Sequence, residues 1–409
     1  MNSNRIVILA MLVISSPGLL LQLSGTDLGI VTNTALFGIS IVAAAFILAW
    51  SAEAAEMDIT QGLAVAFVAL IAVLPEYAVD MSFAWQAGQD PVFAQYAVAN
   101  MTGGNRLLIG AAWPMLVFIL WARTGARKLV LERRYSIEVV SLAVIALYAL
   151  HIPFKGSIEL YDAVILTIAF VVYMYLVSRV PSEEPELIGP ARLIGSLPRT
   201  QRRVTLVLLF SYAAAAILAS AHPFAEGLVH TGTELGFDEF LLVQWIAPLA
   251  SESPEFLIAG ILAWRGRAGV GMGALLSSKV NQWTLLVGGL PVVYAISSGD
   301  LGGLHLDDRQ TEEVLLTAAQ TMFATAIVLS LSLGLWEALA LFVLFSLTFV
   351  FESTQVRLAL SGLYLLLAVG MVIRERAEIP KILRSFRNTV KGIEEEPTEP
   401  QVGAHGGHH

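Results

Sequence analysis

Long, nearly uncharged hydrophobic runs recur along the whole chain, separated by short polar segments. A run of about 20 apolar residues can cross a bilayer as a helix. The strands of a membrane barrel instead alternate apolar and polar residues over about ten positions. The pattern therefore predicts an all-α integral membrane protein with about twelve transmembrane helices. The runs are 5–23, 28–51, 59–87, 92–121, 136–153, 158–178, 204–231, 239–264, 269–297, 312–333, 335–351 and 354–373. Because 312–333 and 335–351 nearly touch, a count from about ten to about twelve fits.

Composition supports a lipid environment and excludes several kinds of site. The 409 residues are 56% hydrophobic and 14% charged, whereas soluble domains carry about 25% charged residues. The chain has no cysteine, which excludes disulfides, thiolate metal sites and cysteine nucleophiles. No basic patch with interleaved aromatic residues suggests nucleic acid as a partner. The first run lacks a signal-peptide cleavage site, so we interpret it as a retained helix.

The basic residues predict the orientation of the chain. Most of the 24 Lys and Arg residues follow the fourth, sixth, eighth and twelfth runs, while the loops between are nearly free of them. Loops rich in Lys and Arg stay in the cytoplasm. We therefore expect a multi-pass protein of the cell membrane with both termini in the cytoplasm. Beyond Ile393 the acidic and glycine-rich tail is expected to be disordered.

A short motif occurs once in each half of the chain. The third run contains Leu74-Pro75-Glu76-Tyr77 and the eighth contains Ser253-Pro254-Glu255-Phe256, and Ala-Trp begins eight residues after each glutamate. A further helix with small and polar residues follows in each half, at 100–105 and 273–279. By the helix count, the third run points outward and the eighth inward, which is an inverted repeat of the kind found in transporters. The predicted parts are an extra N-terminal helix (1–27), a first repeat of five helices (28–180), a cytoplasmic linker (181–203), a second repeat with an extra C-terminal helix (204–378), and a partly disordered cytoplasmic tail (379–409).

The two glutamates of the motif are predicted to lie deep in the membrane. Each lies about 16 or 17 residues into its run, or roughly 25 Å along the helix. A carboxylate at that depth is costly and indicates an ion pathway. The preceding proline is expected to break the helix and free backbone carbonyls, and carbonyl and carboxylate oxygens are the ligands of hard cations. The alternative for either motif alone is an ordinary kink with a structurally paired glutamate.

With these motifs the chain resembles the calcium/cation antiporter superfamily, the sodium/calcium exchanger-like membrane proteins. Members carry G-T-S-x-P-E and G-N-x-x-G-S-N motifs in two inverted repeats. The resemblance covers about residues 28–378, and the Pro-Glu pairs match in both halves. The second motif is matched by Asn100, Gly103 and Asn105 in the first half and by Gly273 and Ser278 in the second. It implies two five-helix halves and alternating access, with transported Ca²⁺, Na⁺ or H⁺ bound transiently and no resident cofactor.

The chain also departs from the family motifs. The residues before the first Pro-Glu are Ala72 and Val73 instead of threonine and serine, and Lys279 replaces the last asparagine of the second motif. Several oxygen ligands are therefore missing from the first half. Multi-sodium exchange needs adjacent oxygen sites, so the ions that this chain exchanges stay open.

The predicted cation ligands combine carboxylates with neutral oxygens. Glu252 and Glu255 are three residues apart and share a helix face, and Asp80 lies one turn after Glu76, as a modulating or supporting charge. Any single neutral residue of the set could instead serve helix packing. The candidates are Glu76, Glu252, Glu255, Asn100, Asn105, Ser251, Ser277 and Ser278.

The role of Lys279 has two interpretations. It lies about 15 Å into its run, beyond the reach of snorkelling to water. We expect it to need a carboxylate partner, with Glu252, Glu255 and Glu76 as candidates. In one interpretation the lysine forms a fixed salt bridge. In the other it is a tethered cation that occupies one ion position and changes the coupling.

The sequence alone is compatible with three functions. The first is a secondary antiporter that exchanges Ca²⁺ or another cation for Na⁺ or H⁺. The second is a monovalent Na⁺/H⁺ antiporter on the same fold, and the third is a channel or a non-transporting membrane protein. An enzyme is disfavoured because no nucleophile–base set, H-E-x-x-H motif or phosphate loop is evident.

Overall fold

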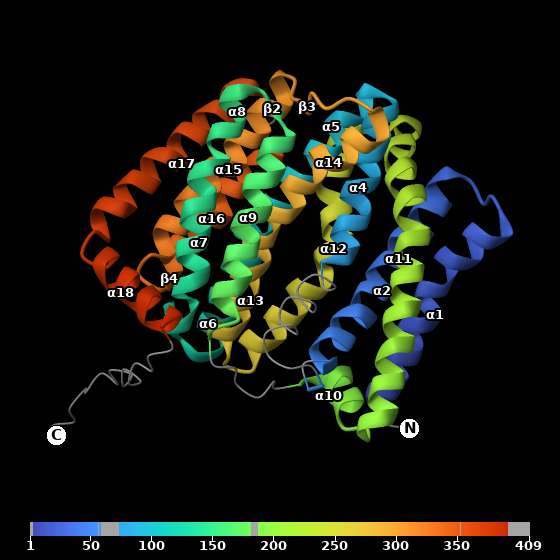
Figure 1. Ribbon diagram of the computed structural model, residues 1–409, viewed down its shortest axis with the longest axis horizontal. Helices are drawn as coiled ribbons and strands as arrows, with labels where there is room; N and C mark the ends of the chain where they lie inside the picture. The colour runs from blue at the N-terminus through green and yellow to red at the C-terminus, as the bar shows by residue number, and fades with distance from the viewer. Residues whose placement is uncertain (1–2, 56, 59–72, 181–186, 352, 392–409) are drawn as a thin grey trace.

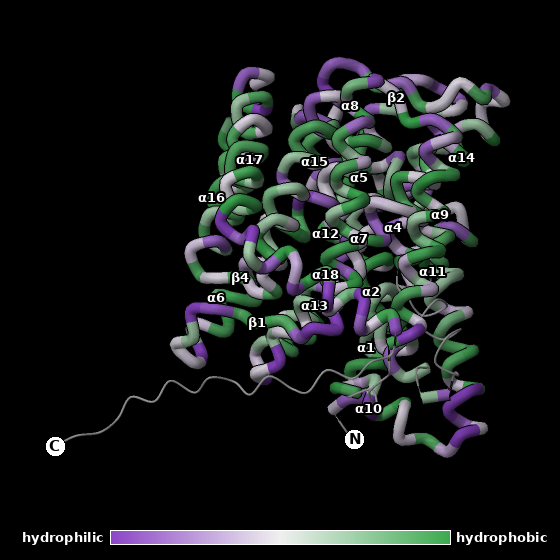
Figure 2. The backbone as a smooth tube through the Cα atoms, turned by 60° about the vertical axis from the view of Figure 1, so that its left-hand side comes forward, coloured by the Kyte–Doolittle hydropathy of each residue, from purple (hydrophilic) through white to green (hydrophobic). Residues whose placement is uncertain are grey.

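The computed structural model describes residues 3–55, 57–58, 73–180, 187–351 and 353–391. The helices stand side by side as a bundle (Figure 1), and hydrophobic residues predominate along them (Figure 2). The helices of the first half are α1 (Ser3–Ser24), α2 (Ile30–Ala55), α4 (Leu74–Gln89), η1 (Pro91–Phe93), α5 (Ala94–Leu107), η2 (Leu108–Ala112), α6 (Trp113–Thr124), η3 (Arg133–Tyr135), α7 (Ser136–Ala149), α8 (His151–Lys155) and α9 (Leu160–Val177). Those of the second half are α10 (Gly189–Gly195), α11 (Arg199–Leu235), α12 (Glu239–Trp264), α13 (Ala268–Asn281), η4 (Gln282–Leu286), α14 (Val287–Ser298), α15 (Asp308–Val328), α16 (Leu335–Val350), α17 (Thr354–Arg374) and α18 (Ile379–Val390).

The helical membrane class predicted from hydropathy is confirmed. In the described residues, 8 helical stretches are long and apolar enough to cross a membrane, and α16 is a shorter apolar helix. The nearly fused runs around Leu333 are two separate helices. The chain turns between α15 and α16 at Leu331, whose φ of 49° lies in the left-handed region. The full count of about twelve crossings stays a prediction.

Two short sheets correct the expectation of a purely helical chain. β1 (Lys128–Val130) pairs antiparallel with β4 (Ser332–Gly334), and β2 (Ser157–Ile158) pairs antiparallel with β3 (Leu304–His305). Each sheet joins a loop of the first half to a loop of the second. The hydrophobic runs carry no signal for such pairs, because two or three residues in a loop are too few to show alternation.

The two halves contain the same helix–π-helix–helix unit. α5, η2 and α6 have 14, 5 and 12 residues, and α13, η4 and α14 also have 14, 5 and 12. When the two units are aligned from their first residues, Asn105 and Lys279 occupy equivalent positions. They are 174 residues apart in the sequence. π-helical turns inside α-helices are rare and occur frequently at functional sites. Matched turns in both halves therefore mark the region next to Asn105 and Lys279.

α12 does not break at its Pro-Glu motif, contrary to expectation. It runs unbroken from Glu239 to Trp264 with Pro248 and Pro254 inside it. A proline frees the carbonyl four residues earlier, and the Ser253 hydroxyl donates to that carbonyl, Ala250 O, at 3.1 Å. Hydroxyl side chains can satisfy a freed carbonyl in this way inside a membrane helix. In the first half, Pro75 lies in the first turn of α4, and Ala72 lies outside the described residues.

α4 and α12 run in opposite directions. The end at which α4 finishes is also the end at which α12 begins, because Tyr96, shortly after α4, donates to Glu239 at 2.5 Å. The arrangement can be followed in Figure 1. Antiparallel placement of the two motif helices agrees with an inverted repeat.

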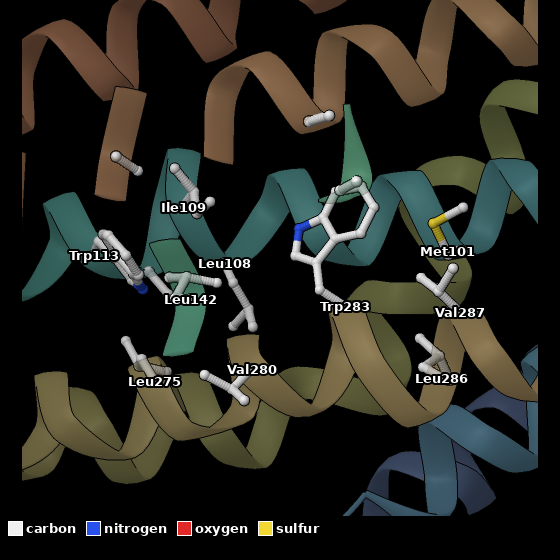
Figure 3. Close-up of a cluster of buried hydrophobic side chains, with 14 of the residues drawn as sticks. Met101, Leu108, Ile109, Trp113, Leu142, Leu275, Val280, Trp283, Leu286 and Val287 are labelled. Carbon is white, nitrogen blue, oxygen red and sulfur yellow. The ribbon is translucent and has the colours of Figure 1, made fainter. Parts of the chain in front are cut away.

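The units that contain the π-helices pack on a common core. Trp113 and Trp283 are fully buried there, among apolar side chains from α5 to α7 and from α13 to α14 (Figure 3). Trp283 Nε1 donates to Thr321 Oγ1 on α15 at 2.9 Å. This packing holds both π-helical turns, and with them the polar residues at their ends, in one arrangement.

The predicted linker and tail contain helices. α10 lies in the linker, and α11 begins at Arg199, before the expected start of its run. The first part of the tail forms α18, which packs on α7 and η3. The disorder expected beyond Ile393 falls outside the described residues.

Candidate cation-binding site

Three elements bring two carboxylates and one amide together in the interior. Glu76 comes from the first turn of α4, Glu252 from the middle of α12 and Gln282 from the start of η4; they are 6%, 3% and 0% exposed. Gln282 Nε2 donates to Glu76 Oε1 at 3.0 Å and also to Glu252 Oε1. One amide group therefore bridges two carboxylates that belong to different halves of the chain.

Two glycines of α5 let α12 approach this site closely. A Cβ on Gly104 would lie 2.8 Å from Glu252 Oε1 and 3.5 Å from Glu76 Oε1. A Cβ on Gly103 would lie 1.7 Å from the backbone oxygen of Gln244, which is the carbonyl that Pro248 frees. The α5–α12 contact therefore needs glycine at 103, whereas a Cβ at 104 would displace only the Glu252 carboxylate.

Several oxygens of the site lack hydrogen-bond partners within the described chain. They are Glu252 Oε2, Glu255 Oε2 and Gln282 Oε1, all buried atoms. Glu255 lies one turn after Glu252 on α12 and is partly exposed. Carboxylate and amide oxygens are the donors that hard cations prefer. In the described residues, no three Asp, Glu or His side chains are grouped closely enough to hold a metal ion, so a cation here would use two carboxylates with amide or backbone oxygens.

Lys279 pairs with an amide rather than with the carboxylate that we expected. Its Nζ donates to Asn105 O at 2.7 Å and to Asn105 Oδ1, and the side chain is 0% exposed. Asn105 Nδ2 donates to Met101 O at 2.8 Å, which turns Oδ1 toward the lysine. In the described chain, no carboxylate forms an ion pair with Lys279. The prediction missed this partner because the two equivalent positions of the repeats meet only in the folded protein.

The remaining predicted ligands are distributed around this centre. Asp80 and Asn100 are both buried and face each other farther along α4 and α5. Ser251 donates to carbonyls of its own helix, Ala247 and Pro248, at 3.3 Å. Ser277 lies 2.7 Å from the hydroxyl of Tyr173. Ser278 is half-buried on α13. The structure therefore joins Glu76 and Glu252 through Gln282, while Ser251 and Ser277 hydrogen-bond to other groups.

In the described chain, Arg106 pairs neither with Asp80 nor with a backbone carbonyl. Its guanidinium forms a buried ion pair with Glu313 of α15 at 2.8 Å and stacks 5.0 Å from the ring centre of Trp245. Gln244 also donates to Glu313, at 3.1 Å. Because Arg106 follows Asn105 on a helix, its side chain points away from the site toward α15. Among the described residues, Asp80 is consequently left without a cationic partner.

Gln282 is a candidate site residue that the sequence interpretation missed. It lies three residues after Lys279, on the same side of the helix, and follows Asn281 directly at the end of a polar stretch. Its position one turn after the lysine was the available signal. The motif comparison ended at Lys279, so Gln282 was not considered.

Comparisons with known proteins show which sequences and structures the chain resembles. The sequence profile of the sodium/calcium exchanger protein family matches residues 30–179 and 205–354. A search of curated proteins finds no match. The solved structure of the H⁺/Ca²⁺ exchanger CAX is 42% identical, with a TM-score of 0.92 over 95% of this chain and 99% of that one.

Two more distant structures share the fold. Native YfkE is 14% identical with a TM-score of 0.58, over 90% of this chain and 99% of that one. The sodium–calcium exchanger NCX_Mj is 14% identical with a TM-score of 0.51, over 77% of this chain and 96% of that one. The family profile covers more than half of this chain, and the helices are long and apolar enough to span a bilayer. The chain therefore belongs to the sodium/calcium exchanger protein family of multi-pass membrane cation antiporters.

Proposed function

We propose that the chain exchanges Ca²⁺ for H⁺ across the membrane by alternating access. One observation carries the proposal: Glu76 and Glu252, from the two halves, share the amide of Gln282 in the interior. Two buried carboxylates this close need a balancing charge, which a divalent cation or protons can supply. A site that accepts either in turn is the minimal requirement of an exchanger.

The charges of the site match one divalent ion. Glu76, Glu252 and Glu255 carry three negative charges when ionised, and Lys279 carries one positive charge. The balance of two negative charges equals one Ca²⁺ or two protons. The ammonium also excludes another cation from its own position by like-charge repulsion.

Two observations favour H⁺ over Na⁺ as the counter-ion. Several adjacent sodium sites would need neutral oxygens from both halves, and the first half carries Ala72 and Val73 where the family motif has threonine and serine. The 42% identical structure is that of an H⁺/Ca²⁺ exchanger. Protons need no coordination shell, so a site poor in neutral ligands suits them.

Alternating access would use the two halves as inverted repeats. The proposal rests on the antiparallel α4 and α12, on the equal 14–5–12 units and on the Asn105–Lys279 contact between equivalent positions. Rocking of one half against the other around a central site is the common scheme for such repeats. The scheme needs the two five-helix halves, with the site near the bilayer midplane.

The orientation is also part of the proposal. α1 begins and α18 ends at the same end of the bundle (Figure 1). Basic segments follow α6, α9, α12 and α17. With about twelve crossings, these four segments would leave the membrane at this same end. Under the positive-inside rule this end faces the cytoplasm of a cell membrane.

One observation supports a second function, monovalent Na⁺/H⁺ exchange. Lys279 places an amine at a position equivalent to Asn105. If it already balances one carboxylate, the remaining charge could be matched by one Na⁺ and one H⁺. This function predicts sodium transport without calcium.

Flux into proteoliposomes tests the proposal. Purified protein is reconstituted, and uptake of ⁴⁵Ca²⁺ is measured under imposed H⁺, Na⁺ or K⁺ gradients, with Glu252→Gln as the matched inactive control. We expect an acid interior to drive Ca²⁺ uptake and the Na⁺ gradient to have no effect. Uptake driven by Na⁺ alone, ²²Na⁺ uptake without Ca²⁺ transport, or Ca²⁺ flux that needs no counter-gradient would each contradict it.

A further inference from the structure

α18 has two chemically different faces. Lys381, Arg384, Arg387 and Lys391 recur at spacings of three, three and four residues, which places them along one side of the helix. Ile379, Ile382, Phe386 and Val390 lie on the opposite side with the same kind of spacing. The helix itself contains no acidic residue. This pattern is typical of helices that lie in the interface of a membrane.

The apolar side of α18 is partly used within the protein. Ile382 is 3% exposed against the bundle, and Ser385 Oγ donates to Arg133 O of η3 at 3.3 Å. Leu383, by contrast, is 50% exposed and lies between the buried side and the basic side. The helix is therefore fixed to the bundle along one edge and presents an apolar flank next to its basic stripe.

Three of the four bases have no acidic partner in the described chain. Lys381 forms an ion pair with Glu378 at 2.7 Å. Arg384, Arg387 and Lys391 form no ion pair with any described residue. We call these three residues the basic stripe. Exposed bases without counter-charges form a complementary surface for anions.

The position of α18 brings the stripe to the membrane surface. Only residues 375–378 separate it from α17, a helix apolar enough to span the bilayer. α18 lies at the end of the bundle where α6 and α10 are also found (Figure 1). Four residues cannot carry a helix far from the level at which α17 leaves the lipid, because an extended chain spans at most about 3.6 Å per residue.

We propose that the basic stripe of α18 binds the headgroups of anionic lipids, with Leu383 inserted at the boundary of the acyl chains. The bilayer is the occupant that the observations favour, since the flank is apolar and the helix already lies at lipid level. An acidic protein partner would account for the charges but not for an exposed leucine beside them. The site is independent of the carboxylates that would carry transport.

The absence of cysteine allows a direct test in the full-length protein. Leu383→Cys gives a unique position for a polarity-sensitive fluorophore. The labelled protein in neutral detergent is titrated with phosphatidylglycerol, and phosphatidylcholine serves as the uncharged comparison. We expect a saturable shift of the emission to shorter wavelength with phosphatidylglycerol alone, weakened at high salt.

Charge variants on the labelled background decide the assignment. Arg384→Gln/Arg387→Gln/Lys391→Gln should raise the lipid concentration at half-maximal response about a hundredfold, since each base near an anionic surface contributes about fivefold. Arg384→Lys/Arg387→Lys/Lys391→Arg should respond like the parent. The matched control neutralises three bases elsewhere at the same end of the bundle: Arg123, Arg179 and Arg265.

The outcomes separate lipid binding from folding and from transport. Thermal unfolding and gel filtration must be unchanged in all variants, so that loss of response reports binding. The proposal is overturned if the parent shows no phosphatidylglycerol response, if its label is already shielded and insensitive, or if both neutralised triples lose the response equally. A failure of Ca²⁺ transport would leave this result untouched, because the fluorophore reports lipid without any flux.

Discussion

Replacing Gly104 by alanine adds a single methyl group beside the carboxylates of the site. The new Cβ would lie 2.8 Å from Glu252 Oε1, 3.5 Å from Glu76 Oε1 and 3.5 Å from Pro248 Cβ. Of these neighbours, the last two are ordinary contacts. The first is too close, so the Glu252 carboxylate must move while the backbones of α5 and α12 can stay in place.

The size of the effect follows from that one short distance. An ordinary contact begins near 3.4 Å, so the oxygen must retreat by about 0.6 Å, beyond the roughly 0.5 Å within which a binding site must be held. A misplacement of 1 Å costs about a hundredfold in comparable sites. We therefore expect the apparent Ca²⁺ affinity to fall about tenfold, or about 1.4 kcal/mol. Helical alanine is about 0.5–1 kcal/mol more favourable than glycine, which offsets strain from the moved carboxylate.

The assay measures initial ⁴⁵Ca²⁺ uptake against Ca²⁺ concentration in proteoliposomes. Gly370→Ala on α17 is the neutral control, since nothing lies within 4 Å of its Cβ. Gly103→Ala is the opposite control, because its Cβ would meet a backbone oxygen at 1.7 Å and neither helix can yield. We expect KM to rise in Gly104→Ala, no change in Gly370→Ala, and loss of folded protein in Gly103→Ala.

Two results would refute this reasoning. If Gly104→Ala transports with the parent's KM, Glu252 does not contribute to the cation site in this position. If Gly104→Ala fails to fold like Gly103→Ala, the contact between α5 and α12 is rigid, and the carboxylate is not the group that moves. Thermal unfolding of all three variants in detergent distinguishes these results.

Further predictions concern the charges. Glu76→Gln and Glu255→Gln should each abolish uptake in vesicles while the thermal unfolding midpoint stays near that of the parent; normal rates in both would contradict a carboxylate site. Lys279→Asn places asparagine at both equivalent positions and removes one amine from the site. We expect the H⁺:Ca²⁺ ratio or the pH profile of exchange to change. An unaltered ratio and profile would show that the role of Lys279 is structural. Outside the membrane, hydrogen bonding to Arg202 lowers the pKa of Asp58, as does the neighbouring Arg203. A lowered folded-state pKa gives stability that is present above the unfolded value of about 3.9 and lost as pH falls below it. The difference in unfolding free energy between the parent and Asp58→Asn should therefore be constant above about pH 5 and shrink below about pH 4, and a pH-independent difference in thermal unfolding would disprove the pairing.

Hydropathy predicted the helical membrane class because a helix in lipid satisfies its backbone hydrogen bonds locally. The helical structure of each apolar run can therefore be predicted from that run alone. The Pro-Glu motifs likewise located Glu76 and Glu255 by position alone. The helix α18 was missed, since its polar and apolar residues alternate with the helical period and lower the mean hydropathy of the segment.

The composition of the site depended on contacts between distant segments. Gln282 lies 206 positions from Glu76 and 30 from Glu252, and nothing in the local sequence around it indicates that it faces them. Lys279 was assigned a carboxylate partner on charge alone. In the folded chain the two equivalent units meet, and Asn105 offers two oxygens at the position where the lysine emerges.

The sequence by itself predicted that long apolar runs form helices and that α4 and α12 each carry a buried carboxylate, and it contains the Pro-Glu motif that recurs in both halves. The tertiary structure alone decided that α12 stays intact through two prolines, that Arg106 pairs with Glu313, and which amide joins Glu76 to Glu252. The physical reason is the range of the interactions. Backbone hydrogen bonds and hydrophobic periodicity act within a few residues, whereas the partner of a buried polar group is whichever group the packing of distant helices brings within about 3 Å.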